Sequence, residues 1–139
     1  MLLIGATIPN GANSGDGAPT DLLVIANSSV PASSVTKAEL KNYFLKKSSR
    51  WSGGLKVIPV NAKADSPERA VFQKRVLGMS ASEETRYFQD LKIKKGITAP
   101  SELGNTQKAV SKLKGAVSYV LRSDFKEGVN KVLLTIPAE

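Results

Sequence analysis

The sequence contains no cysteine and no histidine. The absence of cysteine excludes disulfide bonds, cysteine-ligated zinc and a lipid-modified N-terminal cysteine. The absence of histidine excludes serine–histidine catalysis and the usual histidine metal sites. Neither a nucleophile–base pair nor a metal-binding cluster is recognisable. The sequence therefore predicts a protein that is not an enzyme and that carries no metal or cofactor.

The sequence also lacks any run of about 18 apolar residues, so no transmembrane segment is predicted. Its 139 residues fit one domain, and 41% apolar and 23% charged residues are typical of a globular protein. We predict a flexible segment over residues 1–20 and an α/β domain over residues 21–139. The apolar start, residues 1–6, is too short for a complete signal peptide. It could be the remnant of one, or the start codon could be wrongly assigned.

The net charge of +8 favours anionic partners, which include nucleic acid, lipid headgroups and small oxyanions. The basic residues are scattered over residues 37–131, and Lys92, Lys94 and Lys95 form their densest group. That group lacks the interleaved aromatic residues of nucleic-acid binders, so a solvated basic surface is the simpler interpretation. Nucleic acid is therefore not the expected partner.

Local patterns predict eight helices and strands. Residues 21–26 and 55–60 read as buried strands, and residues 116–121 and 129–136 as two more. Helices are predicted to begin at capping boxes formed by Thr36 with Glu39 and by Ser80 with Glu83. Further helices are predicted over residues 66–77 and from Asn105 or Thr106. The order strand, helix, strand, three helices and two strands predicts an α/β fold with a mixed, mostly parallel sheet flanked by helices.

The stretch from Val57 to Phe72 is the most informative part of the chain, because a strand here leads into a helix. Free amides and the helix dipole attract anions at such a helix start. The candidate oxyanion ligands are the Ser66 hydroxyl, the amides of Glu68 and Arg69, and the Arg69 guanidinium. Small hydroxyl groups in the loop 27–34, at Ser28 and Ser29, could complete the site.

A plain structural interpretation of the same turn is a well-capped helix without a ligand. Pro67 has no N–H, and the carboxylate of Glu68 repels an anion at close range. Asp65 could itself cap the helix and occupy the place of an anion.

Three further residues could lie at the rim of the site. Arg50 could meet an anion, although a solvated arginine is more common. Trp51, the only tryptophan, could face a partner or cover the edge of the core. Tyr119 is expected to bury its ring and to place its hydroxyl at the rim.

Four stretches together resemble the phosphate-type periplasmic substrate-binding proteins of ABC transporters, in particular the short, single-lobe members. DLLVIANSSVPASSVTKAEL is similar to the first strand, loop and capped helix of that family. The stretches YFLKKSSRW, VIPVNAKADSPERAVF and GAVSYV follow in the family's order and spacing. The resemblance covers about residues 21–136. It implies a lobe of the type II periplasmic-binding-protein fold, no enzymatic activity and export to the periplasm.

The departures from the family pattern bear on the ligand. Ser66 and Arg69 match the family's turn, whereas Pro67 and Glu68 replace its glycine and threonine. Ala64 and Ala62 stand where the family has, respectively, an acidic and a basic residue before the turn. The chain also has room for about one of the family's two lobes.

The leading hypothesis is therefore a non-enzymatic protein that binds phosphate or a related oxyanion for an ABC permease. The alternative is a ligand-free interaction module of an envelope-associated complex. A weak nucleic-acid binder is a third hypothesis.

Overall fold

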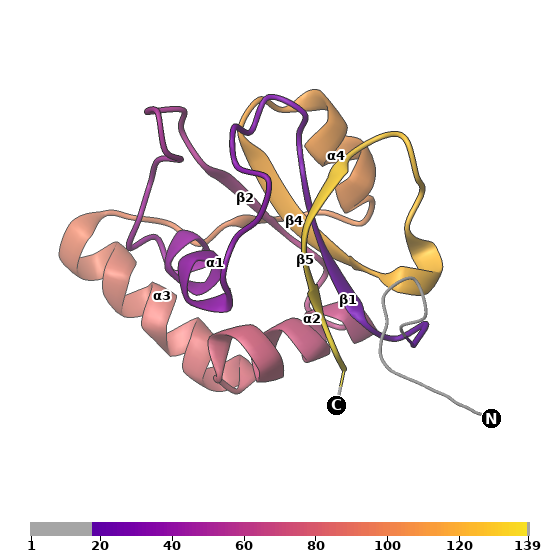
Figure 1. The fold of residues 1–139 in the computed structure, drawn as a ribbon. Coiled ribbons are helices and arrows are strands. Elements are labelled where there is room, and N and C mark those ends of the chain that lie inside the picture. Colours follow the sequence, from indigo (N-terminus) through magenta and orange to yellow (C-terminus); the bar gives the residue numbers. More distant parts are fainter. Residues whose placement is uncertain (1–17, 139) are drawn as a thin grey trace.

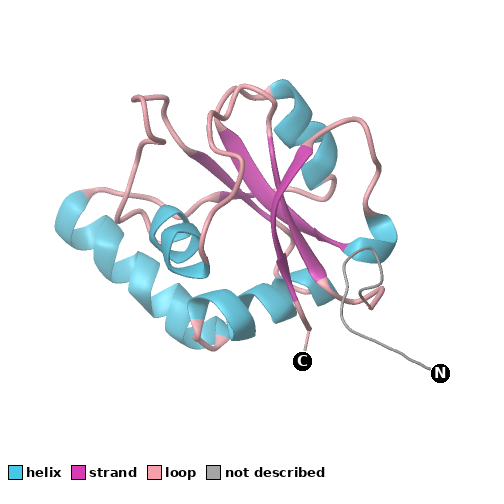
Figure 2. Ribbon diagram, in the orientation of Figure 1, coloured by secondary structure: helices cyan, strands magenta, loops and turns pink. Residues whose placement is uncertain are grey.

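The computed structural model describes residues 18–138. The predicted N-terminal segment, residues 1–20, falls almost entirely outside this range. The described residues form five strands and four α-helices. Figure 1 shows them folded into one α/β unit, and Figure 2 shows helices on both sides of the sheet. The α-helices are α1 (Lys37–Phe44), α2 (Pro67–Phe72), α3 (Ala81–Lys95) and α4 (Thr106–Lys112). The strands are β1 (Leu22–Ala26), β2 (Ile58–Asn61), β3 (Ser101–Glu102), β4 (Ala116–Leu121) and β5 (Lys131–Ile136).

The five strands form one mixed sheet in the order β3-β2-β4-β1-β5. The α/β class and the mixed sheet confirm the prediction, but the expected majority of parallel pairs is wrong. β2 is parallel to β3 and β4, whereas β1 is antiparallel to both β4 and β5. The physical reason is that β1 pairs with the last two strands of the chain rather than with β2, the next strand in sequence.

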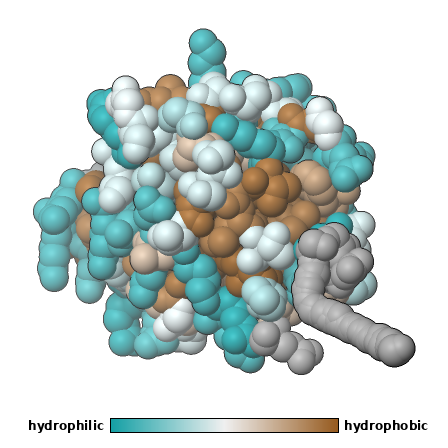
Figure 3. Space-filling model, viewed as in Figure 1, coloured by the Kyte–Doolittle hydropathy of each residue, from teal (hydrophilic) through white to brown (hydrophobic). Residues whose placement is uncertain are grey.

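The sheet separates two apolar clusters by the ordinary alternation of strand side chains. One face of β1 and β4 packs against α1, α2 and α3 in the larger cluster. The other face packs against α4, chiefly through Val110, in a cluster that includes Leu23, Ile25 and Val120. Figure 3 shows an apolar area on the face where β5 lies, and Val132 of this edge strand is exposed.

The helix starts form as their sequences predict. Both capping boxes are complete. The hydroxyls of Thr36 and Ser80 accept from the amides three residues later, and their own amides donate to the carboxylates of Glu39 and Glu83. Gly96 ends α3 in the left-handed conformation that glycine adopts without strain. The predicted helix 66–77 is a short α-helix, α2, followed by a π-helical turn over Gln73–Leu77.

Gly115 is the meeting point of three loops. Its carbonyl accepts from the Trp51 indole at 2.9 Å and from the Ile58 amide at 3.1 Å. Its amide donates to the Ser29 hydroxyl at 3.0 Å. These bonds hold the loops before β2, after β1 and before β4 at one end of the sheet.

Candidate functional site

The structure does not bring the two halves of the predicted site together. Ala26, the last residue of β1, faces Val117 near the start of β4, and Ser29 is bonded to Gly115. Because β2 runs parallel to β4, the opening of α2 follows the other end of the sheet. Ser28 and Ser29 therefore lie at the opposite end of the sheet from Ser66. The reversed direction of β1 relative to β2 is the physical reason.

The hydroxyl of Ser66 is fully used by its own helix. It accepts from the Arg69 amide at 3.2 Å and donates to the Lys63 carbonyl at 2.8 Å. Ser66, rather than Asp65, is the helix cap. The Glu68 amide makes no hydrogen bond within residues 18–138, so it can still donate to a ligand or water. The opening of α2 is thus a capped helix start with few free hydrogen-bond donors for an anion.

The Arg69 side chain turns away from the helix opening into the space between β2 and α3. Its Nη1 donates to the Ala62 carbonyl at 2.8 Å and lies 3.2 Å from Glu102 Oε2. Its Nη2 lies 3.0 Å from Glu84 Oε2. The Nε atom is buried and has no partner among the described residues. Arg69 is therefore not a free guanidinium but the centre of a three-residue ion-pair network.

The two carboxylates on Arg69 are not equivalent. The Glu84 side chain is 5% exposed and also accepts from Gln73, whereas the Glu102 side chain is 43% exposed. Removing one partner of a buried ion pair costs about 3–5 kcal/mol. An exposed pair contributes only about 0.2–1 kcal/mol. Glu84 is therefore a fixed part of the network, and Glu102 is readily displaced.

Burial disfavours the charge of Arg69, yet Tyr119, Glu84 and Glu102 outweigh this effect and leave the pKa of its guanidinium raised. The pKa of Tyr119 is also raised, because its hydroxyl is buried, despite the opposing effects of the Ala62 amide and Arg69. Both groups consequently keep their protons, so Arg69 remains cationic and Tyr119 remains a hydrogen-bond donor.

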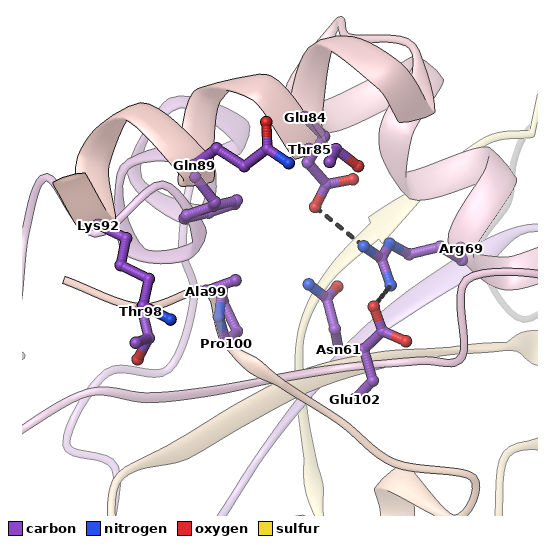
Figure 4. A pocket seen from close by; sticks show the side chains of 11 residues that line it. Asn61, Arg69, Glu84, Thr85, Gln89, Lys92, Thr98, Ala99, Pro100 and Glu102 are labelled. Atoms are coloured by element: carbon purple, nitrogen blue, oxygen red, sulfur yellow. Dashed lines mark hydrogen bonds and ion pairs between the residues drawn. The ribbon is translucent and has the colours of Figure 1, made fainter. Parts of the chain in front are cut away.

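The hydroxyl of Tyr119 fixes the orientation of the Asn61 side chain. It accepts from the Ala62 amide at 3.3 Å and donates to Asn61 Oδ1 at 2.5 Å. Because the oxygen of Asn61 is engaged there, its Nδ2 group is left to face the neighbouring pocket. Figure 4 shows this nitrogen on the side of Gln89 and Ala99.

A pocket of about 340 Å³ opens between α3, the end of β2 and the segment 98–102. Its floor is formed by Asn61, Arg69, Glu84 and Glu102, and Lys92 extends toward Thr98 at its far side (Figure 4). The other lining residues are Thr85, Phe88, Gln89, Ala99 and Pro100. The pocket combines cationic and amide donors with two carboxylates. Such a set of groups can bind a small polar ligand without catalysing a reaction.

Sequence reasoning found Arg69 but missed most of this pocket. The signal that could have indicated it is the helical spacing of Glu84, Phe88 and Lys92, which places all three on one face of α3. No local pattern identifies Glu102 or Asn61, because their roles depend on the pairing of β2 with β3.

The three rim candidates are not at the pocket. Arg50 is exposed, and its Nη1 donates to the Gly54 carbonyl at 2.8 Å. Trp51 and Tyr119 are buried, so neither forms a rim. Tyr119 stacks on Phe72 at 4.1 Å, and Trp51 packs against Tyr43 at 4.7 Å. The expectation that the Tyr119 hydroxyl reaches a rim is wrong, because the chain from Asn61 to Ala62 covers it.

Residues 18–138 lack the features of a metal site and of a membrane span. Among these residues, no group of three or more histidine, cysteine, aspartate or glutamate side chains is placed to hold a metal ion. None of their helices has the length and hydropathy needed to cross a membrane.

No protein-family model and no curated protein matches this sequence. Solved structures do match it. A phosphate ABC transporter substrate-binding protein of Clostridium perfringens, solved with bound phosphate, has a TM-score of 0.61 at 19% identity over 81% of this chain and 43% of that chain. An ABC-type phosphate transport receptor of Vibrio cholerae has a TM-score of 0.62 at 14% identity, over 92% of this chain and 55% of that chain. PstS of Borrelia burgdorferi has a TM-score of 0.60 at 14% identity, over 81% of this chain and 46% of that chain.

At these identities the likeness shows a shared fold, and the chain spans about half the length of the structures it matches. The resemblance noted in the sequence thus reappears in three dimensions, with a five-stranded sheet flanked by helices. The chain has the fold of the phosphate-type substrate-binding proteins of ABC transporters.

Proposed function

We propose that this chain is a non-enzymatic binding protein for phosphate or a related small oxyanion, serving an ABC permease in the periplasm. The fold shared with phosphate-binding proteins supports this proposal. The observation that carries it is the position of Arg69, whose guanidinium reaches the floor of an open pocket from the α2 opening. Arginine is well suited to oxyanions because its planar fork matches their geometry.

Binding at this pocket would use three kinds of donor. Nη1 of Arg69 supplies a charged hydrogen bond, Nδ2 of Asn61 supplies a neutral one, and the ammonium of Lys92 adds charge from α3. The site is displaced from the helix start that the sequence indicated. The Ser66 hydroxyl is occupied within its own helix start, so of these two residues only Glu68, through its backbone amide, can still donate to a ligand.

Thermal unfolding with and without inorganic phosphate tests the proposal. At one hundred times the Kd, a single site should add about 2.7 kcal/mol to the free energy of unfolding. Lys92→Ala should weaken the binding, whereas Lys95→Ala on the same helix, outside the pocket lining, is the matched control. The proposal fails if calorimetry detects no phosphate binding at tens of millimolar in the wild type and in a Glu102→Gln variant.

A second candidate function is a ligand-free interaction module of an envelope-associated complex. Two observations favour it: Arg69 is already paired with two carboxylates, and Pro67 removes an amide from the helix start. Under this alternative, Lys92→Ala leaves the capture of a partner from envelope fractions unchanged. Phosphate then has no effect on the thermal unfolding of the protein.

A further inference from the structure

The carboxylate of Glu102 is placed where an oxyanion would bind. Its Oε2 lies 3.2 Å from Nη1 of Arg69, and both residues line the same pocket as Asn61 and Lys92 (Figure 4). We propose that Glu102 is a tethered competitor that sets the affinity and selectivity of this pocket, and that the ligand is a small dianionic oxyanion that displaces it. This inference rests on the proposed function.

The surroundings of the two carboxylates identify Glu102 as the group that leaves. Glu84 is held from both sides, since its Oε2 accepts from Arg69 and its Oε1 from Gln73 at 2.8 Å. Among the described residues, Glu102 has no ion-pair partner other than Arg69. Its side chain is also much more exposed than that of Glu84. Water can therefore solvate the Glu102 carboxylate when it turns outward, whereas Glu84 would remain buried.

The backbone around Glu102 allows the side chain to turn without loss of the sheet. β3 is a two-residue strand in which Glu102 faces Asn61. The next amide, that of Leu103, donates to the Asn61 carbonyl at 2.9 Å. These backbone contacts do not involve the carboxylate. Displacement therefore requires only side-chain rotation, which is a small and fast motion.

Competition with the Glu102 carboxylate favours a dianion over a monoanion. With Glu102 in place, Arg69 and Lys92 are balanced by Glu84 and Glu102. When Glu102 turns out, one excess positive charge remains, which either a monoanion or a dianion can neutralise, so the preference between them depends on competition with the carboxylate. A tethered carboxylate has a high effective concentration, so weakly interacting monoanions compete poorly with it. Phosphate carries more charge and more acceptor oxygens, and therefore competes better.

The test is calorimetric titration with inorganic phosphate of the wild type, Glu102→Gln and Glu127→Gln. Glutamine keeps the shape of residue 102 and removes its charge. Glu127 is exposed in the loop before β5, so its variant makes the same change in net charge away from the pocket. We expect Glu102→Gln to bind phosphate about tenfold more tightly than Glu127→Gln, which is within the usual range of coupling between interacting groups. Chloride and acetate should also gain relative affinity in Glu102→Gln.

The outcomes separate this inference from the proposed function. If the wild type binds phosphate and Glu102→Gln binds it equally well, the competitor role is wrong while the binding function stands. If neither protein binds phosphate at tens of millimolar, the binding function itself is wrong. Equal gains in Glu102→Gln and Glu127→Gln would reduce the effect to net charge and overturn the inference.

Discussion

Nη2 of Arg69 lies 3.0 Å from Oε2 of Glu84, and both side chains are almost fully buried. This pair joins the first turn of α2 to the first turn of α3, two helices that cover the same face of the sheet. Arg69 also holds the chain after β2 through the Ala62 carbonyl. Its first role in the molecule is therefore structural, and any ligand must bind to an arginine already held in place.

Glu84→Gln should destabilise the protein by about 3 kcal/mol, because it leaves a buried guanidinium without its main counter-charge. Glu102→Gln should cost less than about 1 kcal/mol, since its pair with Arg69 is partly exposed. Urea unfolding of the two variants measures both values. Similar small losses in the two variants would contradict the distinction between the fixed and the displaceable carboxylate.

Ser66→Ala should lower the free energy of unfolding by about 1 kcal/mol, the usual cost of a lost N-cap. It should leave phosphate affinity unchanged, because the hydroxyl serves the helix rather than the pocket. Ser80→Ala, which removes the cap of α3, is the matched control for stability. A large loss of phosphate affinity in Ser66→Ala alone would restore the helix opening as the binding site.

Gly115→Ala should be strongly destabilising, by about 3 kcal/mol or more. Its φ of 79° is left-handed, and an added Cβ would lie 2.1 Å from the Lys56 carbonyl oxygen. Gly128→Ala provides the control, because Gly128 has a φ of 83° but no atom within 4 Å of the added Cβ. Its cost should be only the backbone strain, about 1–2 kcal/mol. Chemical denaturation of both variants tests whether the clash dominates.

The single tryptophan should report on folding. Trp51 is 3% exposed and its indole is bonded to Gly115, so its emission should be blue-shifted and weakly quenched by acrylamide. Unfolding should shift the emission to the red. Trp51→Phe should lose about 1 kcal/mol from the missing hydrogen bond, in addition to any packing loss. Strong quenching in the folded protein would place Trp51 at the surface instead.

Alkaline pH should destabilise the fold. The pKa values of Tyr43, Tyr87 and Tyr119 are all raised, chiefly by burial. The unfolded chain releases these protons near pH 10, before the folded chain does. Stability is therefore complete below about pH 10 and falls as the pH rises above it. Urea unfolding midpoints measured across this pH range, together with phenolate absorbance, test the effect. Tyr119→Phe should lose less stability at alkaline pH than the wild type.

Local features of this fold were predictable because short-range physics determines them. The capping boxes at Thr36 and Ser80 need only residues three apart, and the end of α3 needs only Gly96. The two strands that begin near residues 22 and 116 were visible as apolar runs. Each of these features is read from neighbouring residues in the sequence.

The direction of β1 was not predictable in the same way. The sequence places the loop of Ser28 and Ser29 after one strand and Ser66 after another, and this order predicts that both face one site. Which strands pair depends on residues far along the chain, and no local pattern reports it. Likewise, the partners of Arg69 lie on α3 and β3, so its pairing with Glu84 and Glu102 could not be read from the turn in which it sits.

The pairing of β1 also constrains how the chain can fold. Leu22 faces Leu121 on one side and Ile136 on the other, so the first strand cannot find either neighbour until the ribosome has made both. Pairings between residues so far apart in the sequence slow folding. An emerging chain would keep the apolar strand β1 unpaired, and open to chaperones, until β4 and β5 have been synthesised.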